Sequence, residues 1–152
     1  MIPLLPQNAE VDHEIGAILL KVYLDPRGKG RPRVDRGRAH TDEKTAAWAS
    51  DFEKLTLMAV RNKRDAIKAI WEMPIAIALE LYYQKPKARA EWFCTSPVDN
   101  DNAEKMVWDS CQKIFFKNDN RIIANCTFKD WAPEGERPHV KIRIYPLKKK
   151  EI

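Results

Sequence analysis

The sequence predicts one α+β domain, in which a small mixed β-sheet packs with two main helices. β-favouring apolar residues fill four segments, and apolar residues recur at helical spacing in two others. The resulting order is strand, helix, strand, helix, strand, strand. With 152 residues, of which 44% are hydrophobic, the chain can bury one core. We therefore expect residues 1–152 to form a single domain.

The first half of the chain predicts a strand and a long helix. An apolar run at residues 16–24 ends in an Asp-Pro pair, which is typical of a strand that stops at a turn. Thr41 or Asp42 can cap the helix that follows, which we expect to extend to Ile70. Its expected core stripe is Trp48, Phe52, Leu55 and Ala59.

The second half predicts a strand, a helix and two more strands. Residues 75–83 alternate in the manner of a strand with one face better buried. Asp101 stands where a helix N-cap is expected, and Glu104 completes a capping box, so we predict a helix over residues 102–115. The last two strands are expected at residues 121–131 and 139–147, joined by a turn-rich segment.

Positive charge is concentrated outside these elements, although the net charge is only +5. Residues 27–40 predict an exposed basic arm, residues 84–97 a long polar loop, and residues 148–152 a frayed basic tail. Such cations suit phosphate contacts, which give salt-sensitive affinity without reading sequence. The candidates for DNA binding are Lys29, Arg31, Arg33, Arg36, Arg38, Lys85, Lys87 and Arg89.

Several classes of protein are disfavoured. No apolar run reaches the roughly 18 residues of a membrane span, and no basic segment leads into an apolar signal core, so we expect a cytoplasmic protein. Cys94, Cys111 and Cys126 are an odd, widely spaced set without a CxxC pair, which favours reduced thiols over disulfides or zinc. The three histidines form no metal-ligand pattern.

A set of acidic residues predicts a metal site. If residues 96–101 are extended, Asp99 and Asp101 project to the same side, where Mg²⁺, or Mn²⁺ as a substitute, can lie between them. Asp119 follows after one helix length, and we expect the returning chain to bring it beside the pair. Lys105 lies one turn after Asp101 on the same helix face, where its ammonium can stabilise charge at a phosphate.

A purely structural alternative exists for each motif. Asp and Asn cluster in turns because their side chains bond nearby backbone, so either acidic motif taken by itself favours a turn. The combination with Lys105 and two basic segments reverses that preference and favours a nuclease. Asp109, a further helix turn along, is expected to pair with Lys105 and fix its position.

Three segments resemble the RusA family of Holliday-junction resolvases, especially the versions carried by bacteriophages and prophages. They are Gly28-Lys29-Gly30-Arg31-Pro32-Arg33 with the later Arg38-Ala39-His40-Thr41, Asp99-Asn100-Asp101-Asn102-Ala103-Glu104-Lys105 through Asp109, and Asn118-Asp119-Asn120-Arg121-Ile122. The chain departs from the family pattern at Asn118, where the family has an acid, and at Ser96. Neither departure removes a predicted ligand.

The resemblance implies a homodimer in a bacterial cell that makes paired, Mg²⁺-dependent nicks in four-way DNA junctions, leaving 3′-hydroxyl and 5′-phosphate ends. Asp99, Asp101 and Asp119 match the metal-binding catalytic acids, Lys105 matches the essential lysine, and Asn102 fills a supporting position.

Two other functions are compatible with the same residues. One is a magnesium nuclease for forks, flaps or other branched DNA, and the other is a junction-binding protein without catalysis, although no acid or lysine is missing. Trp92 and Phe93, next to the expected site, can stack on unpaired bases or pack against the protein, and packing is the commoner fate.

Overall fold

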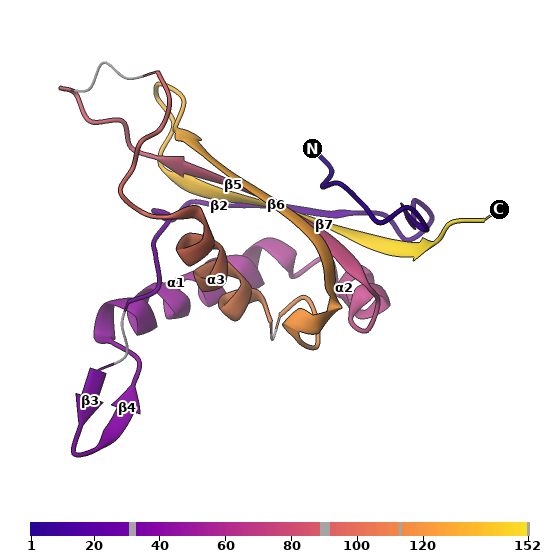
Figure 1. Cartoon of the computed structure of the whole chain (residues 1–152), viewed down its shortest axis with the longest axis horizontal. Helices are drawn as coiled ribbons and strands as arrows, with labels where there is room; N and C mark the ends of the chain where they lie inside the picture. The colour runs from indigo at the N-terminus through magenta and orange to yellow at the C-terminus, as the bar shows by residue number, and fades with distance from the viewer. Residues whose placement is uncertain (31–32, 89–91, 113, 152) are drawn as a thin grey trace.

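The computed structural model describes residues 1–30, 33–88, 92–112 and 114–151. Among these residues, helices cover one face of a five-stranded sheet, and a separate two-stranded hairpin projects on the helical side, away from the sheet (Figure 1). The strands are β1 (Ala9–Val11), β2 (Ile18–Val22), β3 (Arg33–Asp35), β4 (Arg38–His40), β5 (Ile75–Tyr83), β6 (Ile122–Trp131) and β7 (His139–Lys149). The helices are α1 (Glu43–Val60), α2 (Arg64–Ile70), α3 (Asn100–Cys111) and the short 3₁₀ helix η1 (Asp119–Arg121).

The sheet is mixed, as the sequence predicts. Its order is β1-β7-β5-β6, with β2 also paired to β7; β5 and β6 are parallel, and the other pairs are antiparallel. The α+β fold is therefore confirmed.

The central strand β5 is buried on both faces, whereas its alternation predicts one better-buried face. Ile77 and Leu79 pack into the main core, and Ala76 and Ala78 pack into a second cluster with Tyr145. Ala76 and Ala78 are small and only weakly hydrophobic, so the sequence pattern indicates one buried face although both faces are buried.

The first expected helix is two helices. α1 ends at Val60, and α2 begins at Arg64 after a short break. The Asp42 cap is confirmed, since its side chain accepts a hydrogen bond from the Thr45 backbone N–H. The buried stripe differs from the expected one, because Leu55 and Ala59 are exposed. It consists of Thr45, Trp48, Phe52, Thr56 and Val60.

The second expected helix begins earlier than predicted. Asp99, rather than Asp101, is the N-cap of α3, and its side chain makes no capping hydrogen bond. Asp101 therefore lies in the first helical turn, and the predicted capping box with Glu104 is wrong. Because residue 100 onward is helical, Asp99 and Asp101 do not alternate along a strand as expected.

Three elements depart from the predicted loops and tail. The basic arm contains the β3–β4 hairpin, whose turn places Arg36 at φ 50° and Gly37 at φ 76°, the two positive φ values of a tight hairpin turn. Near the C-terminus, Lys148 and Lys149 belong to β7 and pair with the short strand β1. The prediction of a frayed tail is thus wrong for these two lysines, because β1 supplies a partner that the sequence did not reveal.

Candidate active site

The N-terminus of α3 presents two free carboxylates. Asp99 and Asp101 are both exposed, and within the described residues neither side chain has a hydrogen bond or an ion pair. The unpaired backbone N–H groups of a helix N-terminus carry partial positive charge, which favours anionic side chains at these positions. The pair is therefore tolerated by the fold and remains available to an external cation.

Strand β6 holds the start of α3 in place. The Lys129 ammonium donates to the carbonyl oxygens of Ser96 at 2.7 Å and Val98 at 3.0 Å, which fixes the backbone that leads into Asp99. Thr127 donates its hydroxyl to Glu104 at 2.6 Å, one turn into the helix. These contacts fix the direction of the helix relative to the sheet.

Sequence reasoning missed Lys129 as a positioning residue. The register of β5 with β6 places Thr127 opposite Leu79 and Lys129 opposite Leu81, so both polar residues face the helical layer. Polar residues alternating along a predicted strand, on the side that meets a helix, were the available signal.

Lys105 lies on α3 one turn after Asp101 and is exposed, as the helical spacing predicts. Asp109 does not pair with it in this structure. The Asp109 carboxylate lies 2.7 Å from the Lys29 ammonium instead, so the expected Lys105–Asp109 pair is wrong. Asn102 donates to the Lys29 carbonyl at 3.4 Å, which ties the same basic segment to the helix.

The segment before the basic hairpin passes closely over the starts of α1 and α3. A Cβ on Gly28 would lie 2.6 Å from Asn102 Nδ2, and one on Gly30 would lie 1.9 Å from Asp42 Oδ2. The Gly30 N–H donates to the Thr45 hydroxyl, which itself donates to Asp42 at 2.5 Å. Close approach, rather than loop flexibility, explains these two glycines.

Asp42 is the charged residue at this contact between the basic segment and the start of α1. The Thr45 hydroxyl and then the Thr45 backbone N–H donate to its carboxylate, and together they lower the pKa of Asp42 below its usual 3.8. The ionised Asp42 side chain therefore both caps α1 and fixes the path of the basic segment beside it.

The remaining cations lie on two projecting segments. Arg36 and Arg38 are exposed on the hairpin, and Lys85 and Lys87 are exposed in the loop after β5. Figure 1 shows both segments projecting from the end of the molecule that holds the N-terminus of α3. Arg31 and Arg89 lie outside the described residues, as does the Arg33 side chain.

Asp119 lies at the other end of α3. Its neighbour Lys117 donates its backbone N–H to the Trp71 carbonyl at 3.2 Å, beside the start of β5. From Ile122 the chain must travel along β6 to Thr127, about 16 Å at the usual strand rise, before it reaches the N-terminus of α3. Residues 119–121, orange in Figure 1, accordingly lie near α2. The returning chain thus brings Thr127 and Lys129, not Asp119, beside the acidic pair.

The described part of the chain does not bring three carboxylates together in one metal centre. Among the described residues, no group of three or more Asp, Glu, His or Cys side chains is placed to hold a metal ion. Asp99 and Asp101 nevertheless fit Mg²⁺ in part, because Mg²⁺ is commonly bound by one or two carboxylates together with waters and substrate phosphates. The third predicted ligand, Asp119, does not fit this centre in a single protomer.

Two exposed aromatic side chains lie in the loop that leads into the site. Trp92 is 87% exposed and Phe93 78%, with their ring centroids 6.4 Å apart. The expectation that they pack against the fold is therefore wrong for the isolated chain. Large apolar side chains with this exposure are available to a partner.

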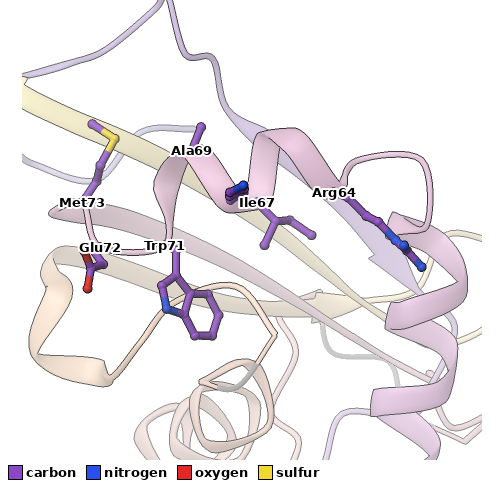
Figure 2. A pocket seen from close by; sticks show the side chains of 7 residues that line it. Arg64, Ile67, Ala69, Trp71, Glu72 and Met73 are labelled. Carbon is purple, nitrogen blue, oxygen red and sulfur yellow. The ribbon is translucent and has the colours of Figure 1, made fainter.

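A hollow of about 560 Å³ lies elsewhere, beside α2. Figure 2 shows Arg64 and Glu72 at its two ends, with Trp71 and Ile67 between them. None of the predicted site residues lines it, so it does not belong to the candidate site.

The fold and site define a small α+β DNA-processing domain whose acidic helix N-terminus lies between basic segments. The family model for the endodeoxyribonuclease RusA matches residues 24–145, and the chain belongs to that family. A search of curated proteins finds no match. The described helices include none that is both long and apolar enough to cross a membrane.

Proposed function

We propose that this protein is a structure-selective endodeoxyribonuclease that resolves four-way DNA junctions by paired, Mg²⁺-dependent nicks. The single observation that supports this most strongly is the free carboxylate pair Asp99 and Asp101, presented at a helix N-terminus of a RusA-family domain. Membership of an endodeoxyribonuclease family indicates the class of reaction. The four-way junction as substrate, the Mg²⁺ dependence and the paired nicks are what we propose in addition.

The protein's own residues would act by position and charge. Asp99 and Asp101 would hold Mg²⁺, which when bound supplies a Lewis acid for phosphodiester hydrolysis. Lys105, one turn along the helix, would place its ammonium against a phosphate oxygen and stabilise the charge that develops during cleavage. Lys129 would hold the backbone before Asp99 in place through its two hydrogen bonds to carbonyl oxygens.

The basic segments would orient the DNA. Arg36 and Arg38 on the hairpin and Lys85 and Lys87 on the loop can contact phosphates on either side of the acidic pair. Lys29 would contribute less, because its ammonium is already paired with Asp109. Contacts of this kind select a DNA shape rather than a sequence, which suits a branched substrate in the bacterial cytoplasm.

A homodimer is part of this proposal. A four-way junction has near two-fold symmetry, and two equivalent sites in a symmetric dimer can cut two of its strands. The exposed Trp92 and Phe93 favour branched DNA over continuous duplex, since unpaired bases at a branch point can stack on them.

Cleavage of matched substrates tests the proposal. Labelled four-way junction, fork, flap and linear duplex with the same arm sequences are incubated with the protein and Mg²⁺ or EDTA. Symmetric nicks confined to the four-way junction support the proposal. Preferred cutting of forks or flaps supports the broader branched-DNA nuclease, and junction binding without cleavage in either Mg²⁺ or Mn²⁺ supports the non-catalytic protein.

A further inference from the structure

We infer that a cleft beside the acidic pair binds one unpaired base of the branched DNA. The cleft has a volume of about 710 Å³ and lies between the loop that follows β5 and the turn that joins β6 to β7. Figure 1 shows these two segments at the end of the sheet that is nearer the start of α3. The inference rests on the proposed function and deepens it, because it assigns a place to one base of the same substrate.

The side of the cleft formed by the end of β6 and the following turn is held by three contacts. The Ala132 backbone N–H donates to the Tyr83 carbonyl at 2.7 Å, which ties the end of β6 to the end of β5. The turn closes on itself, because the Glu136 N–H donates to the Pro133 carbonyl at 2.9 Å. Lys21 forms an ion pair with Glu136 and so holds the turn against β2. This side is therefore ordered before DNA binds, which lowers the cost of binding.

Two tryptophan side chains from different segments line the cleft. Trp131 is the last residue of β6 and packs, partly buried, against the main core, so its position is fixed. Trp92 lies on the loop and is exposed. Any base can stack on an aromatic ring through its π-face, and small-ligand sites commonly have volumes of about 300–1,000 Å³. The cleft therefore has both the walls and the size for an unpaired base.

The cleft is close to electrically neutral. Among the described residues that line it, the acids are Asp130, Glu134 and Glu136 and the cations are Lys85 and Arg137. Because Lys21 pairs with Glu136, three negative charges meet three positive ones. A neutral cleft suits a base better than a phosphate, and the Asp130 carboxylate can accept a hydrogen bond from an N–H group on the edge of the base.

Lys85 is the cation available for the DNA backbone at this cleft. It is exposed and has no partner among the described residues. The Arg137 guanidinium, in contrast, lies over the Tyr23 ring, 4.8 Å from its centroid. We therefore expect Lys85 to contact a phosphate beside the bound base.

The cleft adjoins the acidic pair. Lys129 bonds the Val98 carbonyl, next to Asp99. Trp131 follows Lys129 on the same face of β6, about 7 Å further along the strand. Since successive nucleotides of one strand rise about 3.4 Å along the duplex axis, a base in the cleft belongs within a few nucleotides of a phosphate at Asp99. Base pairs at a branch point lack a continuous stack on one side, so extruding a base costs least there.

Removal of single bases tests the cleft. Affinity is measured in EDTA, where no strand is cut, for four-way junctions in which each nucleotide near the branch in turn lacks its base. For the wild type we expect one position at which the loss of the base weakens binding roughly 5- to 150-fold. In Trp92→Ala the same loss should have little further effect. Phe93→Ala is the matched control, because Phe93 is equally exposed but is not among the described residues that line the cleft, and it should keep the full effect.

Other results overturn the cleft. They are base loss that is tolerated at every position, base loss that costs Trp92→Ala as much as the wild type, and an effect that Phe93→Ala abolishes. Cleavage of the junction in Mg²⁺ with any of these results leaves the proposed function in place. Conversely, the expected dependence on Trp92 without cleavage supports the cleft and contradicts the nuclease.

A duplex with one bulged nucleotide decides the case in which the wild type does not bind the four-way junction. Weaker binding when the bulged nucleotide lacks its base, in the wild type and not in Trp92→Ala, supports the cleft although the proposed function fails. Equal binding with and without the bulged base overturns the cleft as well.

Discussion

Gly30 lies so close to Asp42 that a β-carbon on the glycine would be 1.9 Å from the carboxylate oxygen Oδ2. The Asp42 side chain cannot simply move away, because it caps α1 and accepts a hydrogen bond from the Thr45 hydroxyl. A single contact thus couples the stability of the first helix to the placement of the basic segment.

Gly30→Ala should disturb both at once. We expect a loss of about 1–3 kcal/mol in the free energy of unfolding, as for other added methyl groups without room, together with weaker junction binding. Thermal unfolding and a gel-shift titration measure the two effects. Gly135→Ala is the control for junction binding, because its turn holds none of the predicted DNA contacts and a Cβ there meets nothing within 4 Å. A Gly30→Ala variant with the unfolding temperature of the wild type would contradict the account.

Acid should weaken the same contact. Thr45 lowers the pKa of Asp42 below 3.8, so the ionised carboxylate stabilises the folded state above that pH. The stabilisation is lost as the pH falls through the lower folded-state pKa. Asp42→Asn keeps the cap but removes the charge. We expect its unfolding temperature to lie below that of the wild type at pH 7 and to converge with it below pH 3.8; a difference that stays constant with pH would refute this.

Lys129→Met should slow cleavage without removing any acid. Its ammonium fixes the Ser96 and Val98 carbonyls, and a misplacement of about 1 Å at a reacting group can cost roughly 10²-fold in rate. We expect a 10- to 100-fold slower single-turnover rate, nearly unchanged junction affinity, and faster amide exchange in residues 94–99. Lys141→Met, which alters a cation on the opposite face of the sheet over Tyr82, should change none of these. Unchanged amide exchange in Lys129→Met would contradict a positioning role.

The strands β5, β6 and β7 could be predicted from the sequence because each contains several β-favouring residues, continuous or alternating with polar ones. The limits of α3 could not, since Asp99 and Asp101 are both acceptable at a helix start. β1 was missed because three residues carry little periodic signal, and its pairing with Lys148 and Lys149 is a tertiary contact.

The acidic pair, Lys105 and the basic segments were predicted as site components from their residue types. Their positions relative to one another were harder to predict. Sequence spacing indicates that Asp119 follows one helix after Asp101, but the direction in which that helix runs along the sheet decides whether the two meet. The alternation of polar residues singles out Lys129 as a candidate, but its position opposite Leu81 depends on the strand register, which one sequence does not reveal.

The exposed aromatic side chains should contribute to junction binding. Stacking on a base is worth about 1–3 kcal/mol, so Trp92→Ala or Phe93→Ala should weaken four-way-junction affinity roughly 5- to 150-fold. Duplex affinity and the unfolding temperature should change little, because neither side chain is buried. Met58→Ala removes a similarly exposed apolar side chain from α1 and serves as the control. A change in oligomeric state with unchanged junction affinity would assign the aromatics to a protein interface instead.

The central claim is that phosphodiester cleavage takes place at the N-terminus of α3, and Asp101→Asn tests it most directly. Asp51→Asn, which neutralises an exposed acid on α1, is the matched control. With labelled four-way junction and Mg²⁺, we predict that Asp101→Asn loses at least about 10²-fold in cleavage rate, keeps or increases its junction affinity, and that Asp51→Asn matches the wild type. Wild-type cleavage by Asp101→Asn would contradict the assignment of this site.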